Sequence, residues 1–291
     1  MSNYNQSNIC TYCGIENSKD ILSTKTSEDR LPYKLNYHLY RCHNCDLIYT
    51  FEHGEEHLEA IKNYFKESYN VGRVDNPKEY ISNIWSKFDD NRKNCQILLR
   101  KSLLHLPFRT PMLGKYPQGR IREGLRILDG KSLKSLLDVG SAFGDFVVNA
   151  RMHGFEAYGL EPTEEIVKII QKYVGPDIVH SGAFPKDTGP LEQYDSVTFF
   201  HTLIYFPVIN KTIFQKLKSI LSPNGVAMIF AYNTETLDKG DKKLSLLENP
   251  MATNFTSETF FRNVCDEFNF SKYERIPSYR EKDSSYHILT V

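Results

Sequence analysis

The sequence lacks an excess of charge of either sign. Its 291 residues carry 36 Lys and Arg side chains against 36 Asp and Glu side chains. Long-range electrostatics therefore does not draw the whole chain toward nucleic acid or an anionic membrane. No apolar run approaches the roughly 20 residues that a membrane-spanning helix needs, and residues 1–8 are polar, without the apolar core of a secretory signal. We therefore expect a cytoplasmic protein without a membrane span.

Internal repeats and low-complexity tracts are also absent from the sequence. The apolar fraction of 40% is ordinary for a globular protein and supports a real core. Since domains average about 100–200 residues, the length suits one large domain and a smaller one.

Cysteine is scarce and unevenly placed. Four of the six cysteines form two C-x-x-C pairs with 28 residues between them, and these are Cys10, Cys13, Cys42 and Cys45. This arrangement is typical of a zinc ribbon, in which each of two knuckles offers two thiolates to a tetrahedral ion. Disulfides and coincidence are the alternatives, and the short spacing without an export signal argues against coincidence. Because four thiolates fill the coordination sphere, we expect zinc to be structural rather than catalytic.

Residues 136–146 combine an apolar strand, a glycine turn and the start of an amphipathic helix. The strand carries Asp138 near its end, and Gly140 and Gly144 allow the backbone to turn sharply and approach a ligand closely. A dinucleotide-binding turn needs the pattern G-x-G-x-x-G, whereas Ala142 stands at the position of the second glycine. The acid at the strand end suits a positively charged or hydroxyl-rich ligand, so a nicotinamide dinucleotide is disfavoured.

Strand-like segments recur after this turn at the spacing of strand–helix–strand units. These segments are 158–162, 178–184, 194–201 and 221–230. Such alternation predicts an α/β fold with a largely parallel sheet and helices on both faces.

In this order, the segments resemble the motifs of class I S-adenosylmethionine (SAM) dependent methyltransferases. Residues 136–146 are similar to the glycine-rich first motif, and residues 221–225 are similar to the turn before the fifth strand. The resemblance implies a Rossmann-like sheet that is parallel except for its last strand. Residues 268–273 and 286–291 suit the antiparallel strands that end this sheet.

Two C-x-x-C pairs precede these motifs. In this combination the chain resembles a bacterial group of methyltransferases that act on sugars, nucleotide-linked sugars and polysaccharide or natural-product precursors. We expect a zinc-ribbon module at 1–50, a helical cap at 51–134 and a SAM-binding methyltransferase domain at 135–291. The cap contains a Pro/Gly-rich basic insert, since residues 100–134 hold nine Lys and Arg against two acids. This insert suits either a solvated face or a phosphate-binding surface.

The resemblance implies that eight residues at the strand ends bind SAM. Those expected around its methionine end are Asp138, Gly140, Ser141 and Gly144. Those expected around its ribose and adenine are Glu161, Pro162, Ala183 and Phe184. Glu161 would accept hydrogen bonds from the ribose hydroxyls, as an acid about twenty residues beyond the glycine turn does in doubly wound folds. Gly182 stands where many relatives have Asp, which leaves recognition of the adenine amino group open.

Two residues after the fourth strand are candidates for catalysis. Many relatives read H-x-L-E-H there, and this chain keeps His201 but has Ile204 and Tyr205 in place of Glu-His. The resemblance places His201 at the methyl-transfer site, where its near-neutral pKa suits a general base. The alternative is that His201 only packs beneath the cofactor. Tyr205 would either orient an acceptor hydroxyl or join the aromatic core.

The expected activity is SAM-dependent O-methylation of a sugar, a nucleotide-linked sugar or another small hydroxyl-bearing metabolite. We favour O- over C-methylation because C-methylating relatives of this type carry a further C-terminal domain, for which the chain has no room. One alternative is an RNA methyltransferase, since zinc ribbons precede SAM domains in one rRNA-modifying group and the basic insert could follow phosphates. Against it, no N/D-P-P-F/Y base-flipping tetrapeptide follows the fourth strand. A non-catalytic module that binds SAM or a partner is the other alternative, and the sequence does not indicate an oligomeric state.

Overall fold

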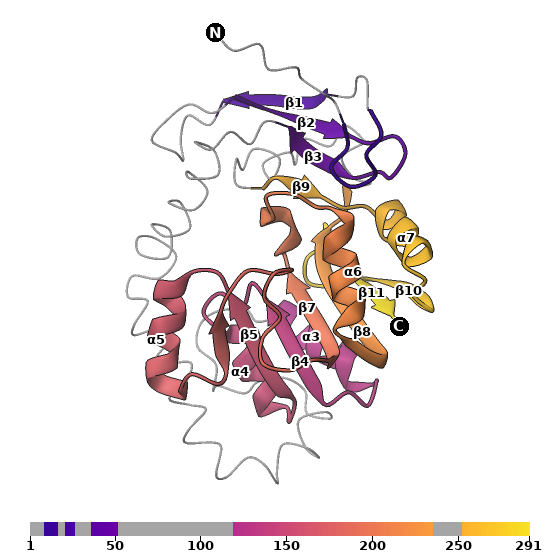
Figure 1. Ribbon diagram of the computed structural model, residues 1–291. Helices are drawn as coiled ribbons and strands as arrows, with labels where there is room; N and C mark the ends of the chain where they lie inside the picture. The colour runs from indigo at the N-terminus through magenta and orange to yellow at the C-terminus, as the bar shows by residue number, and fades with distance from the viewer. Residues whose placement is uncertain (1–8, 17–20, 27–35, 52–118, 235–251) are drawn as a thin grey trace.

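In the computed structural model, a small sheet lies above a larger one (Figure 1). The structure describes residues 9–16, 21–26, 36–51, 119–234 and 252–291. Residues 52–118 of the expected helical cap, with the part of the basic insert that they contain, lie outside the described residues.

The larger sheet has seven strands in the order β10-β11-β8-β7-β4-β5-β6. Its bounds are β4 Ser135–Val139, β5 Glu156–Glu161, β6 Val179–Ser181, β7 Tyr194–Phe200, β8 Leu221–Tyr232, β10 Lys272–Pro277 and β11 Ser284–Thr290. Neighbours from β6 to β8 are parallel, and β11 is antiparallel to both β8 and β10. This topology confirms the expected Rossmann-like α/β class and its antiparallel last strand.

The strand order reverses at β4, which pairs with β5 on one side and β7 on the other. At such a switch point the loops after the two central strands leave toward opposite faces, and a crevice opens outside their carboxyl ends. The glycine turn follows β4, and His201 follows β7. The fold therefore places the glycine turn and His201 after neighbouring parallel strands, at the same edge of the sheet.

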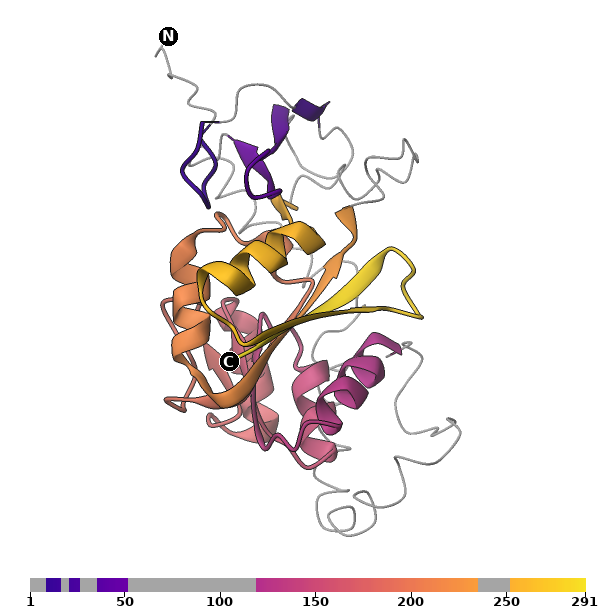
Figure 2. The same ribbon diagram turned by 90° about the vertical axis from the view of Figure 1, so that its right-hand side faces the viewer.

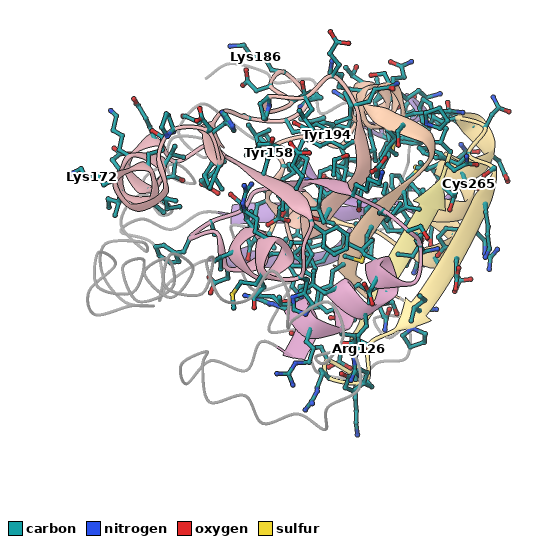
Figure 3. The ribbon with its side chains drawn as sticks, turned by 90° about the horizontal axis from the view of Figure 1, so that it is seen from below. Arg126, Tyr158, Lys172, Lys186, Tyr194 and Cys265 are labelled. Carbon is teal, nitrogen blue, oxygen red and sulfur yellow. The ribbon has the colours of Figure 1, made fainter. Side chains whose placement is uncertain are left out.

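Helices cover both faces of this sheet. Alternate side chains of β8 pack into two different apolar clusters, because successive residues of a strand face opposite sides. One face carries α3 (Gly119–Asp129), α4 (Asp145–Met152) and α5 (Glu164–Val174), and the other carries α6 (Lys211–Ser219) and α7 (Glu258–Glu267). Figure 2 shows α3 and α7 on opposite sides of the β10–β11 hairpin. Seen from below, Tyr158 and Tyr194 lie together, with ring centroids 6.3 Å apart (Figure 3).

Helix α3 differs from the expectation for its residues. Their basic composition placed them in the insert, yet Ile121, Leu125 and Leu128 face the sheet at helical spacing and are buried with α4. The helix thus packs as part of the methyltransferase layers, although it precedes the expected boundary at residue 135.

The smaller sheet joins segments from both ends of the chain. Strands β1 (Ile21–Thr26), β2 (Asn36–Arg41) and β3 (Ile48–Phe51) form an antiparallel meander. Its fourth strand is β9 (Asn254–Phe255), which pairs with β3 through Ile48 and Tyr49. Backbone pairing therefore fastens the N-terminal strands to the part of the chain that follows β8.

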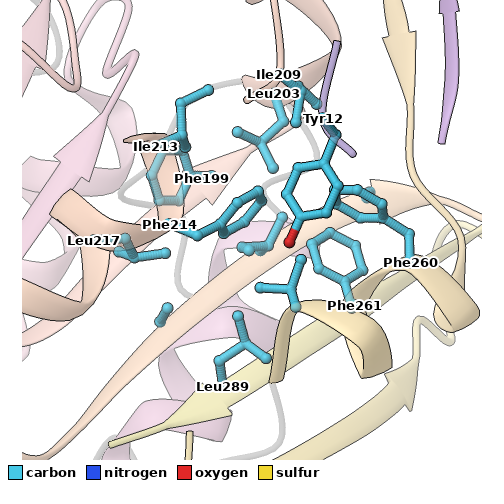
Figure 4. Close-up of a cluster of buried hydrophobic side chains, with 14 of the residues drawn as sticks. Tyr12, Phe199, Leu203, Ile209, Ile213, Phe214, Leu217, Phe260, Phe261 and Leu289 are labelled. Carbon is cyan, nitrogen blue, oxygen red and sulfur yellow. The ribbon is translucent and has the colours of Figure 1, made fainter. Parts of the chain in front are cut away.

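Tyr12, between the first two cysteines, anchors this N-terminal region on the helices. Its buried ring lies edge-on to Phe214 of α6 and Phe260 of α7, with centroids 5.9 and 4.9 Å away (Figure 4). The Tyr12 hydroxyl donates a 2.7 Å hydrogen bond to Oε2 of Glu267. Nearby, the Thr11 hydroxyl donates to the carbonyl of Ile209 at 3.0 Å. The first knuckle is thus packed on the methyltransferase fold.

We predict that Tyr12→Ala lowers the free energy of unfolding by about 3–5 kcal/mol, as for other large buried aromatic side chains. Tyr12→Phe should cost about 1 kcal/mol, since it removes one hydrogen bond to a partly exposed carboxylate. Urea unfolding of the metal-saturated protein measures both values. Tyr279→Phe is the matched control, because Tyr279 is 55% exposed and should change stability by less than about 0.5 kcal/mol. A Tyr12→Ala protein as stable as the wild type would contradict this packing.

Candidate active site and metal centre

The glycine turn after β4 is held in conformations that few side chains tolerate. Gly140, Ala142 and Gly144 have φ values of 71°, 49° and 80°. A Cβ on Gly140 would lie 2.4 Å from Cγ2 of Thr202, so the turn touches the loop after β7. The Ser141 side chain points toward β5, and its buried hydroxyl has no hydrogen-bond partner within the described parts of the chain. Contact between Ser141 and a ligand would therefore come from its backbone.

Asp138 is buried in the sheet beside this turn. It is 3% exposed, and the Thr198 hydroxyl on β7 donates to its Oδ1 at 2.8 Å. Burial raises the pKa of the Asp138 carboxyl to about 7, although the bond from Thr198 opposes the shift. The charge of the carboxyl therefore changes near neutral pH, and a cationic ligand would favour its ionised form.

Glu161 ends β5 and connects that strand to the glycine turn. Its two carboxylate oxygens accept backbone hydrogen bonds, Oε2 from Ala142 at 2.9 Å and Oε1 from Thr163 at 3.0 Å. Burial raises the pKa of Glu161, and the hydrogen bonds from Thr163 and Ala142 oppose this. Each carboxylate oxygen has a second lone pair. The carboxylate is thus fixed in place with capacity for two further donors.

The loop after β6 holds the residues expected near adenine. Phe184 is buried, while Pro162 after β5 is exposed. A Cβ added to Gly182 would lie 2.7 Å from Cβ of Asp187. Oδ2 of Asp187 accepts a hydrogen bond from the Ala183 N–H at 2.9 Å. A carboxylate therefore lies next to Gly182 after all, supplied from five residues further on. The sequence motif gave no signal for Asp187, because only the fold of the turn brings it there.

His201 directly follows β7 in a strained backbone conformation. Its φ is 54°, which is uncommon for a residue other than glycine. The residue is 8% exposed, and its ring stacks on Tyr232 with centroids 4.2 Å apart. The His201 N–H donates to the carbonyl of Phe230 at 3.0 Å. Strain of this kind often accompanies a functional site.

The two ring nitrogens of His201 have different surroundings. Nε2 lies 3.2 Å from Oε2 of Glu281, in the turn between β10 and β11. Nδ1 is buried and has no hydrogen-bond partner among the residues that the structure describes. Burial lowers the pKa of His201, the bond to Glu281 raises it, and the positive charge of Arg120 lowers it. Glu281 was not found by sequence reasoning, since it lies 80 residues from His201 and belongs to no motif.

Tyr205 lies in the single turn η1 (Leu203–Tyr205), four residues after His201. Its partly buried side chain packs against an apolar cluster at the junction of the two sheets, which includes Ile48, Ile204 and Phe255. This placement favours the aromatic-core interpretation of Tyr205. The structure thus brings Asp138, Glu161 and Thr202, the residue after His201, to one glycine turn. Tyr205 lies at the junction of the two sheets.

The four N-terminal cysteines form one cluster. Their Sγ atoms all lie within 4.8 Å of one another, with Cys10 and Cys45 at 3.6 Å and Cys13 and Cys42 at 3.5 Å. A zinc tetrahedron with bonds of about 2.3 Å has sulfur–sulfur edges of about 3.8 Å. The cluster of four sulfur atoms is therefore compatible with such an ion.

The two knuckles also share one backbone geometry. Cys10 N–H donates to the carbonyl of Ile15, and Cys42 N–H donates to the carbonyl of Leu47, both at 2.9 Å. The residue that follows the second cysteine of each knuckle has a positive φ, which is 70° at Gly14 and 62° at Asp46. Burial raises the pKa of the Cys13 thiol to about 11. A cation in the cluster would oppose that effect by stabilising the thiolates.

The chain is similar in sequence to one known protein family. A family model described as a methyltransferase domain matches residues 112–274, more than half of the chain. No curated protein matches the chain in sequence. The described residues contain no helix long and apolar enough to cross a membrane.

Among solved structures, the chain is similar to a putative O-methyltransferase from Nostoc punctiforme, with 14% identity, a TM-score of 0.49 and coverage of 73% of this chain and 69% of that one. A possible histamine N-methyltransferase from Thermotoga maritima has 15% identity, a TM-score of 0.45 and coverage of 72% and 99%. A SAM-dependent methyltransferase from Archaeoglobus fulgidus has 13% identity, a TM-score of 0.47 and coverage of 60% and 95%. On the strength of the family match and the sheet topology, the chain belongs to the methyltransferase domain family and is a class I SAM-dependent methyltransferase.

Proposed function

We propose that the protein O-methylates a sugar, a nucleotide-linked sugar or another small hydroxyl-bearing metabolite. The observation that supports this most is the His201 ring, whose buried Nδ1 has no partner among the described residues. The adjacent Thr202 lies against Gly140 of the glycine turn, which supports a position of the acceptor between that turn and His201. An aliphatic hydroxyl keeps its proton at neutral pH and benefits from a base, whereas an amine attacks through its free lone pair.

In this proposal the cofactor binds along the carboxyl ends of β4, β5 and β6. SAM supplies an electrophilic methyl group on a positively charged sulfur atom. Ionised Asp138 attracts the cationic amino group of the methionine part, and Glu161 accepts hydrogen bonds from the ribose hydroxyls. The Asp187 carboxylate offers an acceptor to the adenine amino group. The remaining contacts fall to the backbone or apolar surface of Gly140, Ser141, Gly144, Pro162, Ala183 and Phe184.

The proton of the acceptor hydroxyl passes to Nδ1 of His201. As the new O–C bond forms, the C–S bond breaks and its electron pair stays on sulfur, so His201 ends the step protonated. Burial lowers the pKa of His201, which keeps the imidazole neutral and ready to accept a proton near pH 7. General-base assistance of this kind contributes about 10²–10⁴ in rate.

We also propose that Cys10, Cys13, Cys42 and Cys45 bind one zinc ion. The sulfur spacing and the matching knuckle geometry support this assignment. Four sulfur ligands close the coordination sphere, so the ion stabilises the fold and takes no part in methyl transfer.

Transfer of a labelled methyl group from SAM tests the acceptor class. We predict that label enters nucleotide-linked or free sugars and not tRNA or rRNA. His201→Gln should lower kcat at least tenfold while SAM affinity measured by calorimetry stays near the wild-type value, because the base is lost and the cofactor site is kept. Label that enters RNA alone would contradict the proposal, as would full turnover by His201→Gln with a flat pH profile.

The pKa of Asp138 near 7 makes SAM binding depend on pH. Below that pKa the carboxyl is neutral and does not attract an amino group, so affinity should rise about tenfold from pH 5.5 to 7. This range lies below the pKa of an α-amino group, about 7.7–8.0, so the ligand keeps its charge. Calorimetry should show weak, pH-independent binding for Asp138→Asn. Asp129→Asn, at the exposed end of α3, is the control and should keep the wild-type slope.

For the metal, we predict one zinc ion per chain in freshly purified, unchelated protein. Cys13→Ser should lose the ion because three sulfur ligands hold it poorly, whereas Cys265→Ser on α7 should keep it (Figure 3). Elemental analysis by mass spectrometry measures the content of all three proteins. Wild-type protein without metal would exclude the zinc site.

A further inference from the structure

We propose that Glu281 is a positioning residue for His201, and this inference rests on the proposed role of His201 as the base. The turn between β10 and β11 brings Glu281 to the ring that follows β7. Oε2 of Glu281 lies 3.2 Å from Nε2 of His201. The two residues thus form a carboxylate–imidazole pair with the second ring nitrogen on its far side.

A buried carboxylate on α3 fixes the turn that carries Glu281. Glu123 accepts a 2.8 Å hydrogen bond from the Ser278 hydroxyl and a 2.9 Å bond from the Tyr279 N–H. The Ser278 oxygen in turn accepts the Glu281 N–H at 3.0 Å. Glu281 therefore projects from a segment whose backbone is tied to the methyltransferase core, and its carboxylate has a defined position.

The pair determines which nitrogen of His201 carries the proton. An ionised carboxylate only accepts hydrogen bonds, so Nε2 must be the protonated nitrogen of the neutral ring. Nδ1 is then an acceptor, and within the described residues it has no donor. A buried polar atom without a partner is costly, and a substrate hydroxyl would supply the missing donor. Glu281 thus orients the ring and leaves the free lone pair on the nitrogen that receives the proton.

Among the residues that the structure describes, few charged or titratable groups face His201. Glu281 contacts the ring edge, Arg120 of α3 lies 3.7 Å from the other carboxylate oxygen, and Tyr232 of β8 stacks on the ring. The bond to His201 holds the pKa of Glu281 below its usual range, so the carboxylate is ionised near neutral pH. Its negative charge stabilises the imidazolium that proton transfer creates.

Nitrogen-detected NMR of ¹⁵N-labelled protein tests the pair without an acceptor substrate. The chain has nine histidines, and the signals that vanish in His201→Gln identify those of His201. We expect the wild-type ring to be protonated on Nε2 when neutral. Glu281→Gln keeps an acceptor oxygen but removes the charge, so it should keep this tautomer and lower the His201 pKa by about one unit. Glu281→Ala should also mix the two tautomers.

Glu274→Gln on the same hairpin is the matched control, because Glu274 pairs with Lys272 and should leave the His201 signals unchanged. Glu281 is partly exposed, and its near-isosteric Gln variant should keep the wild-type thermal midpoint. With a hydroxyl acceptor in hand, the acid limb of the kcat profile should move to lower pH in Glu281→Gln by the same amount as the pKa. A His201 pKa and tautomer that match the wild type in both Glu281 variants would overturn the inference. Failure of every hydroxyl acceptor would instead refute the proposed function, and the NMR result would still stand.

Discussion

The site depends on a close approach between the loops after β4 and β7. The Thr202 hydroxyl donates to the carbonyl of Val139 at 2.9 Å, and the absence of a Cβ on Gly140 makes room for the Thr202 methyl group. The same turn donates the Ala142 N–H to Glu161 on β5. One short segment therefore connects three strand ends, and a larger residue at 140 would push against the Thr202 side chain after β7.

Acidic groups gather at this point although burial opposes their charge. The negative charge of Glu161 contributes to the raised pKa of Asp138, after burial itself. Such an arrangement costs stability while no cation is bound, because the hydrogen bonds to Asp138 and Glu161 offset only part of the desolvation of their carboxylates. A ligand with a positively charged amino group and hydroxyl donors would relieve both carboxylates together. The electrostatics of the site and the cofactor of the family thus agree.

The parts of the fold that follow from local pattern were predictable from sequence. Strand alternation, the glycine turn and the paired cysteines each reflect neighbouring residues, and the sheet topology confirmed the first of these expectations. Helix α3 was missed because a count of basic residues hid the apolar spacing of Ile121 and Leu125. Glu281 and Asp187 were missed for another reason. Their positions are set by turns that bring distant or shifted residues to the site, and a linear motif carries no information about such contacts.

The pairing of β3 with β9 has a consequence for how the chain is made. Residues 48 and 255 are partners in the small sheet, so its last strand is synthesised after some 200 residues of intervening chain. At about 5–20 residues per second, the two knuckles leave the ribosome about 10–40 s before β9 does. The Tyr12 ring likewise gains its contact with Phe260 only after residue 260 has been synthesised. During synthesis the two knuckles then hold all four clustered cysteines while the edge of β3 is still unpaired, and an ion bound by these cysteines would keep the knuckles ordered until the rest of the chain covers them.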